Sequence, residues 1–431
     1  MEQRRKNLTQ LFIPICLETL LYMLSGMVDT LMLSSVNDQA VGAVGTANTY
    51  IGIFIIMFSV ISSGMVAVMT QNIGAGRPGV AYQARQLGLA FNAVLGIILS
   101  LILAFGAGTI LAGVGVADAL MQPARTYLQI VGGFCILNAL IPICSSYLRA
   151  FGFSKEPLYA SIIGNVINFC LNAFFLFVLH KGVAGVATAT VVSRIINLVI
   201  VVLLGAVLVK AKQHPERESN REVMGQIIRI GFPSACETAI YNVSMTLVIR
   251  FLNQMDAQGL NVTARSYTMQ ITNFSYCVGA ALAQANAIMT GWHIGAKEYD
   301  ACDRGTKKAA VIGVIVAVIL ETVFTLCSGW IMQLFSKDPQ MVSLVGKLLA
   351  IDIVLEIGRV TNLVYGQALK TSGDAVFPVV MGACFMILCS VGGTYLFGIR
   401  LGLLAVGAYI GMAGDECVRA IGMYLRWKSG K

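Results

Sequence analysis

The sequence predicts an all-α integral membrane protein with twelve transmembrane helices in two parallel six-helix lobes. Three observations predict this fold class: the composition, the number of long apolar runs, and an internal repeat. Hydrophobic residues make up 57% of the 431 residues and charged residues only 12%, whereas a soluble protein is about 25% charged. Because so few charges cannot cover a surface that faces water, the composition favours a lipid environment.

Long apolar runs recur along the whole chain. A helix that crosses a hydrocarbon core of about 30 Å needs roughly 20 apolar residues. The first run begins near Leu8 and is longer than the core of a signal peptide, so we interpret it as the first span. Short alternating runs typical of barrel strands are not seen, and helices are the other way to satisfy the backbone in lipid. The expected spans are 10–34, 46–70, 86–112, 122–148, 158–179, 185–209, 226–252, 262–290, 307–333, 342–369, 376–398 and 402–426.

The second half of the chain repeats motifs of the first half in the same order. The segment 14–22 (PICLETLLY) aligns with 233–241 (PSACETAIY), and 148–157 (LRAFGFSKEP) aligns with 369–378 (LKTSGDAVFP). Such a repeat predicts two related lobes. Six spans per half is an even number, so both halves enter the membrane from the same side, as in a parallel repeat. We expect an N-lobe at 1–209, a polar cytoplasmic linker at 210–225 and a C-lobe at 226–431.

The distribution of lysine and arginine predicts the orientation. With the N-terminus inside, 19 of these residues fall in cytoplasmic segments and only 4 in outer segments, namely Arg125, Lys181, Lys337 and Arg400. The positive-inside rule therefore predicts that both termini are cytoplasmic. We expect a multi-pass protein of the plasma membrane. The same bias explains the net charge of +9, so no nucleic-acid partner is expected.

Motifs for enzymatic or metal chemistry are not found in the sequence. The eleven cysteines are scattered without CxxC spacing, and the three histidines lie far apart. There is no P-loop for ATP and no HExxH motif. We therefore expect no catalytic residues, no metal site and no cofactor. Two related lobes instead favour a transporter, because rocking one lobe against the other exposes a central cleft to each side in turn.

Charged residues inside the first and seventh spans are candidates for this cleft. A charge at the centre of a span costs about 2.5–3.5 kcal/mol on insertion scales, so it usually faces the protein interior. Glu18 and Asp29 share the first span, and eleven residues of helix leave them on nearly the same face, ~16 Å apart. Glu237 is the counterpart of Glu18 in the repeat. These carboxylates either bind a proton, a sodium ion or a cationic substrate, or form structural hydrogen bonds to a neighbouring helix.

The tenth span carries three further charges. Asp352, Glu356 and Arg359 fall on one helical stripe, so they either contribute to the cleft or neutralise one another. Arg250 and Glu321 lie near the ends of their spans, where we expect long side chains to reach the membrane surface.

Short motifs near the span ends point to a known family. The motifs are Val28-Asp29-Thr30, Ala43-Val44-Gly45, Gln71-Asn72 through Gly74-Ala75-Gly76-Arg77, Leu369 through Gly373-Asp374, Asp415-Glu416 with Arg419-Ala420, and Arg426-Trp427. Together with the parallel repeat, they resemble the multidrug and toxic compound extrusion (MATE) family over nearly the whole chain. The resemblance implies an antiporter in which an inward gradient of protons or sodium ions drives the export of organic cations or other amphiphilic compounds. Because a two-lobed transporter can work alone, we expect it to act as a monomer.

The resemblance also implies positions for an ion site. In the family, the aspartate that matches Asp29 has partners on the fifth and sixth helices, which correspond here to Asn168, Asn172 and Thr190. The family often has an aspartate where this chain has Asn172. Another branch places ion-binding carboxylates in the second lobe, at positions that correspond to Tyr241 and Arg359. Because these residues depart from the pattern, Glu237 or Glu356 are alternative ion-binding residues.

Three other classes of function compete with the cation-coupled antiporter. A flippase for a lipid-linked precursor resembles the same superfamily fold, but the carboxylates within the spans favour cationic cargo. A membrane enzyme would need paired catalytic groups, and a receptor or structural protein would not need an ion site. Dye export from cells distinguishes these classes, and we expect Asp29→Asn to weaken it.

Overall fold

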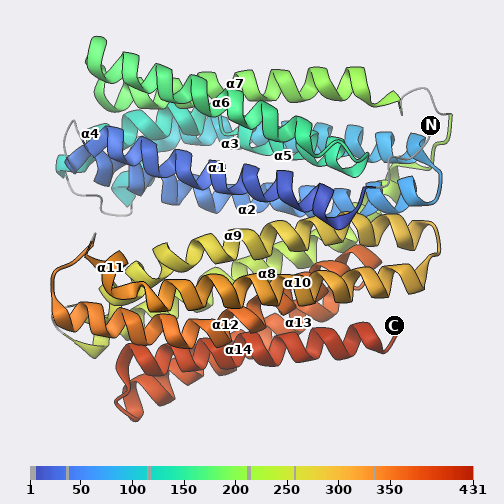
Figure 1. The fold of residues 1–431 in the computed structure, drawn as a ribbon. Coiled ribbons are helices and arrows are strands. Elements are labelled where there is room, and N and C mark those ends of the chain that lie inside the picture. The colour runs from blue at the N-terminus through green and yellow to red at the C-terminus, as the bar shows by residue number, and fades with distance from the viewer. Residues whose placement is uncertain are drawn as a thin grey trace. The chain divides into compact units, whose positions relative to one another are not determined.

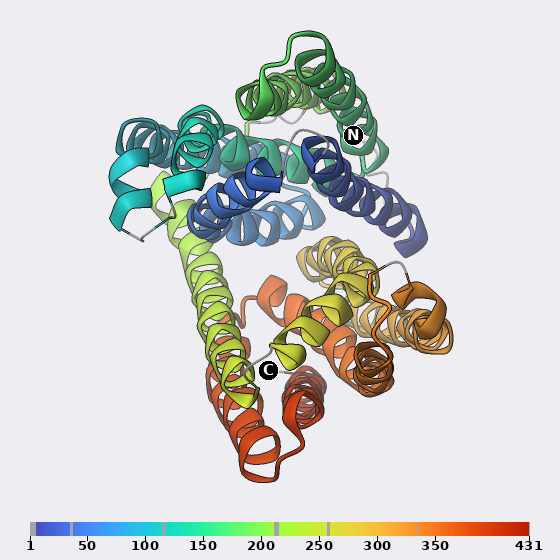
Figure 2. The ribbon, with the colours of Figure 1, turned by 90° about the vertical axis from the view of Figure 1, so that its left-hand side faces the viewer.

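The computed structural model describes residues 6–34, 38–113, 116, 118–210, 215–256, 259–333 and 335–430, and these are almost entirely helical. The chain divides into two compact units, residues 1–232 and 233–431. The division falls at Pro233 inside one long helix. The helices within each unit run roughly parallel or antiparallel to one another (Figure 1) and are seen closer to end-on in Figure 2.

Six helical segments precede residue 210 in the described part of the chain. The fourth is a broken span, bent by 42° between α4 and α5, and the fifth ends in a π-helical turn. Gly132 and Gly133 lie at the bend, where a π-helical turn interrupts the α-helical hydrogen bonding. The elements are α1 (Leu8–Ser34), α2 (Asp38–Gly74), α3 (Pro78–Gly113), α4 (Asp118–Tyr127), a π-helical segment (Leu128–Gly132), α5 (Ile136–Ala150), α6 (Lys155–Ala173), its π-helical extension (Phe174–Val178) and α7 (Gly182–Leu208).

Six more helical segments follow in the described residues after position 215. The elements are α8 (Asn220–Met255), α9 (Leu260–Gly295), α10 (Tyr299–Leu326), the short α11 (Ser328–Met332), α12 (Pro339–Ser372), α13 (Val376–Phe385), two π-helical segments (Met386–Val391 and Thr394–Arg400) and α14 (Leu404–Lys428). Each of the twelve expected spans therefore coincides with a helix or with a run of consecutive helices.

Length and hydropathy alone mark seven single helices in the described part as able to cross a membrane, or eight if the bent α4–α5 pair is one span. The four long segments that fall outside this set are α8, α9, α12 and α14. Three of them, α9, α12 and α14, carry the buried charged residues of the second unit except Glu321, which lies on α10. The apolar side chains that line the outer faces remain exposed, for example Phe105 at 84% and Leu326 at 80%. Such faces require lipid.

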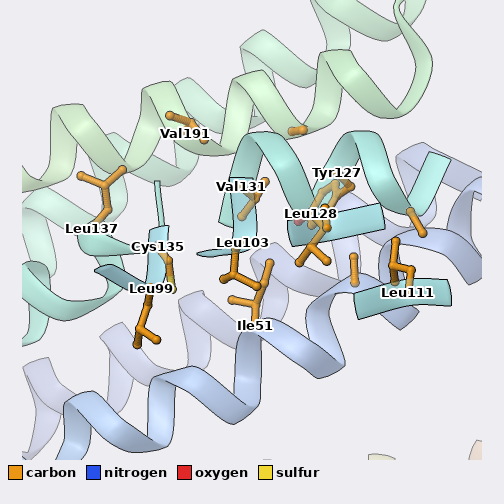
Figure 3. Close-up of a cluster of buried hydrophobic side chains, with 14 of the residues drawn as sticks. Ile51, Leu99, Leu103, Leu111, Tyr127, Leu128, Val131, Cys135, Leu137 and Val191 are labelled. Carbon is orange, nitrogen blue, oxygen red and sulfur yellow. The ribbon is translucent and has the colours of Figure 1, made fainter. Parts of the chain in front are cut away.

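The core of the first unit is a cluster of aliphatic and small side chains on α2, α3, α7 and the α4–α5 region. Ile51, Leu103 and Val131 are at its centre (Figure 3). Ala43, Ala47 and Ala107 are fully buried in the same cluster. Small residues at these positions let membrane helices approach closely, which gains van der Waals contact where lipid supplies no hydrophobic driving force.

The second unit is organised around α12, which contacts α9, α10 and α14. Asp338 caps its beginning by accepting a hydrogen bond from the backbone N–H of Gln340 at 3.0 Å, and Pro339 occupies the first helical position. Gly373 ends the helix in the left-handed conformation with φ of 102°. The helix is therefore defined by local sequence at both ends, and its middle carries Asp352, Glu356 and Arg359.

Gly358 allows α14 to lie directly against α12. A Cβ atom at this position would lie 2.7 Å from the backbone nitrogen of Cys417 and 2.8 Å from the carbonyl carbon of Glu416. No side chain fits there, so glycine fixes the distance at which the charged residues of the two helices meet.

Candidate functional site: a charged pocket in the second unit

Glu18 in the first unit forms an ion pair with a neighbouring helix. Its Oε2 lies 2.5 Å from Nη2 of Arg149 on α5, and the hydroxyl of Ser161 on α6 donates to Oε1 at 3.3 Å. The side chains of the pair are only 15% and 10% exposed. Arg149 thus neutralises Glu18 within the first unit.

Asp29 occupies a separate polar site on the same helix. Nδ2 of Asn172 on α6 donates to Asp29 Oδ1 at 2.7 Å and also contacts Asn168 Oδ1 at 3.2 Å. Both asparagines are buried, and Asp29 is half-buried. Thr190 on α7 is buried, but its hydroxyl donates to the carbonyl of Val186 in its own helix. The structure therefore brings three of the four residues of the expected first-lobe site into direct contact.

The repeated motif forms the same ion pair in the second unit. Oε2 of Glu237 on α8 lies 2.5 Å from Nζ of Lys370 on α12. In the repeat, Glu237 corresponds to Glu18 and Lys370 corresponds to Arg149. The two motifs that the sequence analysis aligned separately are therefore in contact with each other, once in each unit.

A pocket of about 420 Å³ lies within the second unit. Its walls combine charged groups with large apolar and aromatic side chains from α8, α9, α12 and α14. The pocket is concave and unusually rich in charged groups, so a ligand there would have to satisfy charge as well as apolar contact. The charged residues that line it are Glu237, Arg265, Asp352, Arg359, Lys370, Glu416 and Arg419, and the tyrosines are Tyr241, Tyr276 and Tyr409.

Two arginines organise most of the acidic groups at this pocket. Arg359 forms an ion pair with Glu356 one turn before it on α12, and its Nε lies 3.7 Å from Glu416 on α14. Arg419 contacts Asp415 at 2.9 Å and Glu416 at 2.9 Å. The two acids on α14 accept further hydrogen bonds, because Asn362 donates to Glu416 at 3.0 Å and Ser390 donates to Asp415 at 3.0 Å.

Three carboxylates next to this network have buried oxygens without hydrogen-bond partners. Glu321 on α10 offers one ligand atom that lies within 4.8 Å of ligand atoms of Asp352 and Glu356. All three side chains are at most 2% exposed. Within the described residues, both oxygens of Glu321, Oδ2 of Asp352 and Oε2 of Glu356 have no hydrogen-bond partner. Unpartnered buried carboxylates are unfavourable as bare anions, so such a cluster is chemically suited to take up a proton or a metal cation.

The position of Glu321 corrects one expectation from the sequence. We expected this residue to reach the membrane surface because it lies near the end of its span, but its side chain is fully buried against α12. The other residue of that expectation, Arg250, is exposed. Of the three charges on α12, Arg359 forms an ion pair with Glu356, whereas Asp352 forms none within the described residues. Hydropathy could not reveal this, since burial depends on which helix packs over the residue.

The candidate site residues therefore fall into separate groups. In the first unit, Glu18 belongs to an ion pair and Asp29 to a polar site with Asn168 and Asn172. In the second unit, Asp352, Glu356 and Arg359 share one region, to which the structure adds Glu321, Arg265 and the charged residues in the middle of α14. Asp415, Glu416 and Arg419 had been noted in the sequence as a motif, without a role in the site.

Comparison with known proteins identifies the family. The MatE family model matches residues 14–174 and 233–396. The uncharacterized transporter YisQ of Bacillus subtilis is 34% identical over 422 residues, covering 96% of this chain and 92% of the relative. A probable multidrug resistance protein NorM of Thermotoga maritima is 23% identical over 447 residues, covering 99% and 93%.

Solved structures give the same fold. An outward-facing multidrug resistance MATE transporter of the MOP superfamily matches with a TM-score of 0.88 at 18% identity, covering 98% of this chain and 95% of that one. A MATE structure in the bent conformation matches with a TM-score of 0.89 at 17% identity, covering 98% and 94%. These matches confirm the predicted fold class of twelve membrane helices in two lobes. The chain therefore belongs to the MATE family of multi-pass membrane transporters, which are not enzymes.

Proposed function

We propose that the protein is a cation-coupled antiporter that exports organic cations and related amphiphilic compounds by alternating access. The observation that carries this proposal is the pocket of the second unit, which adjoins the carboxylate cluster of Glu321, Asp352 and Glu356, where four buried oxygens have no hydrogen-bond partner within the described residues. Asp352 belongs to both, since it lines the pocket and joins the carboxylate cluster. A group shared in this way can couple cation binding to cargo binding, because occupancy of one site changes the charge at the other.

The coupling cation in this proposal is a proton or a sodium ion. Three adjacent carboxylates cannot all remain ionised at low cost in a buried site, so they gain from binding one positive charge. Asp29 with Asn168 and Asn172 is a second, weaker candidate, because Asn172 supplies an amide and not a second carboxylate. Glu18 and Glu237 have cationic partners, so we assign them to holding helices together.

The remaining topology belongs to the same proposal. The N-lobe comprises 1–209, the linker 210–225 and the C-lobe 226–431, with both termini in the cytoplasm and the protein acting as a monomer in the plasma membrane. The named multidrug resistance relatives support drug-like cargo. They do not favour the flippase alternative that the superfamily fold had left open.

Transport in proteoliposomes tests the proposal. The purified protein is reconstituted, a proton gradient and a sodium gradient are imposed separately, and the movement of a fluorescent lipophilic cation is followed. We expect at least one gradient to drive dye transport above that of protein-free liposomes. Equal dye distribution with and without protein, under both gradients and for a panel of cationic dyes, would overturn the proposal.

A further inference from the structure

Arg265 is the one basic residue lining the pocket of the second unit that has no acidic partner within the described residues. It lies on α9, its side chain lines the pocket, and the residue is only 6% exposed. Its sole hydrogen-bond contact within the described residues is from Nη2 to the sulfur of Met245 at 3.8 Å, and its Nε has no partner. A thioether is a weak acceptor, so five strong donors are left almost unused.

The other basic residues of the pocket are all paired with acids. Lys370 pairs with Glu237, Arg359 with Glu356, and Arg419 with Asp415 and Glu416. Arg265 forms no ion pair with any residue in the described ranges. A buried arginine cannot lower its cost by losing its proton, because the guanidinium stays charged in proteins. An unpaired guanidinium directed to an open pocket therefore points to an oxyanion as its partner.

The surroundings of Arg265 show what kind of molecule would carry this oxyanion. The same pocket has apolar and aromatic walls, including Met269, Tyr276 and Met412, and it contains Asp352 with an unpartnered oxygen. Tyr409 lines the same pocket as Arg265 and Asp352. The pocket thus offers a guanidinium, apolar and aromatic side chains and a carboxylate to one ligand.

We propose that the cargo is zwitterionic: an aromatic amphiphile whose acidic group, a carboxylate or a similar oxyanion, binds Arg265 while its cationic group binds near Asp352. This inference rests on the proposed export function and narrows its substrate class. A planar guanidinium binds a carboxylate through two parallel hydrogen bonds, which gives both affinity and orientation. A purely cationic compound would leave Arg265 unpaired and meet an additional positive charge in the pocket.

A matched pair of dyes tests the inference on the full-length protein in detergent. The zwitterionic free acid of a rhodamine and its cationic methyl ester differ only in the acidic group, and fluorescence anisotropy gives the affinity of each. We expect the wild-type protein to bind the free acid about tenfold more tightly, as the loss of a charge-assisted hydrogen bond would give. The ratio of the two affinities should fall to near one in Arg265→Gln. It should fall to an intermediate value in Arg265→Lys, which keeps the positive charge but loses the two parallel hydrogen bonds.

Control variants and separate readouts keep the outcome interpretable. Arg250→Gln removes an exposed arginine of the same unit and should leave the ratio unchanged. Thermal melting of each variant identifies loss of folding, in which case Arg265→Lys carries the test. A wild-type ratio near one, or a preference that survives in Arg265→Gln, would overturn the inference. Displacement of the free acid by an anionic phospholipid, but not by a water-soluble aromatic carboxylate, would also overturn it by assigning Arg265 to lipid headgroups.

The two proposals fail in different ways. If the antiport proposal is wrong, neither dye is moved by an ion gradient in proteoliposomes, although the binding preference for the free acid remains. If only the substrate class is wrong, the methyl ester is transported and bound as well as the free acid.

Discussion

The carboxylates of Glu321 on α10 and Asp352 on α12 lie within 4.8 Å of each other inside the second unit, and neither forms an ion pair within the described residues. A carboxylate oxygen of Glu356 also lies within 4.8 Å of both, but Glu356 forms an ion pair with Arg359. Like charges this close favour uptake of a cation, because each carboxylate raises the cost of ionising the next. The relationship makes the cluster, rather than Asp29, our first candidate for ion coupling.

We expect a cation to stabilise the folded protein through this cluster. At a concentration 100 times its dissociation constant, a bound ion adds about 2.7 kcal/mol to the stability of the folded state. The melting temperature in detergent should therefore rise with added sodium ions, or with falling pH if the proton is the coupling ion, and Glu321→Gln should abolish the rise. Asp300→Asn, which changes an exposed carboxylate of the same unit, is the control. A cation effect of equal size in wild type and Glu321→Gln would rule out this site.

The ion pair between Glu237 and Lys370 predicts a strong coupling between the two residues. Removing one partner of a buried pair leaves an uncompensated charge and costs about 3–5 kcal/mol, whereas removing both costs much less. We expect Lys370→Met to lower the melting temperature clearly and the double variant with Glu237→Gln to recover most of the loss. The equivalent cycle at Glu18 and Arg149 should give the same pattern. Additive losses in the double variants would show that the pairs do not hold the helices.

The close crossing of α12 and α14 predicts a large effect from one methyl group. Gly358→Ala would force the backbone at Cys417 away, and overpacking of this kind costs roughly 1–3 kcal/mol. Gly305 on α10 is a matched control, because a Cβ atom there meets nothing within 4 Å. Gly305→Ala should therefore be neutral or stabilising by up to about 1 kcal/mol. Thermal melting of both variants measures the difference, and an equal effect at the two glycines would contradict the packing.

Much of the fold and part of the site could be predicted from the sequence for identifiable physical reasons. Lipid requires long apolar helices, so the spans were visible in the composition. The repeat also contained the partners Glu18 with Arg149 and Glu237 with Lys370, although alignment showed only that the motifs correspond. The burial of Glu321 and the isolation of Arg265 could not be predicted. Both depend on which side chains of α8, α9, α10 and α12 meet in three dimensions, and no local pattern records this.

Asp256, in the connection between α8 and α9, predicts a pH-dependent contribution to stability. Its Oδ1 accepts a hydrogen bond from the backbone N–H of Leu260 at 2.8 Å, and its Oδ2 accepts from the backbone N–H of Asn261 at 3.1 Å. Slight burial acts to raise the pKa of Asp256, but the hydrogen bonds from Asn261 and Leu260 outweigh it and leave the pKa below its ordinary value of 3.8. A lowered pKa stabilises the fold at pH values above the ordinary pKa, and this stabilisation is lost as pH falls through the folded-state pKa.

Asp256→Ala should therefore cost about 1 kcal/mol at neutral pH, as the loss of a helix cap does. In thermal melts, the difference between wild type and variant should shrink toward zero in strong acid. A difference that stays constant from neutral pH to strong acid would mean that the ionised carboxylate does not hold the beginning of α9.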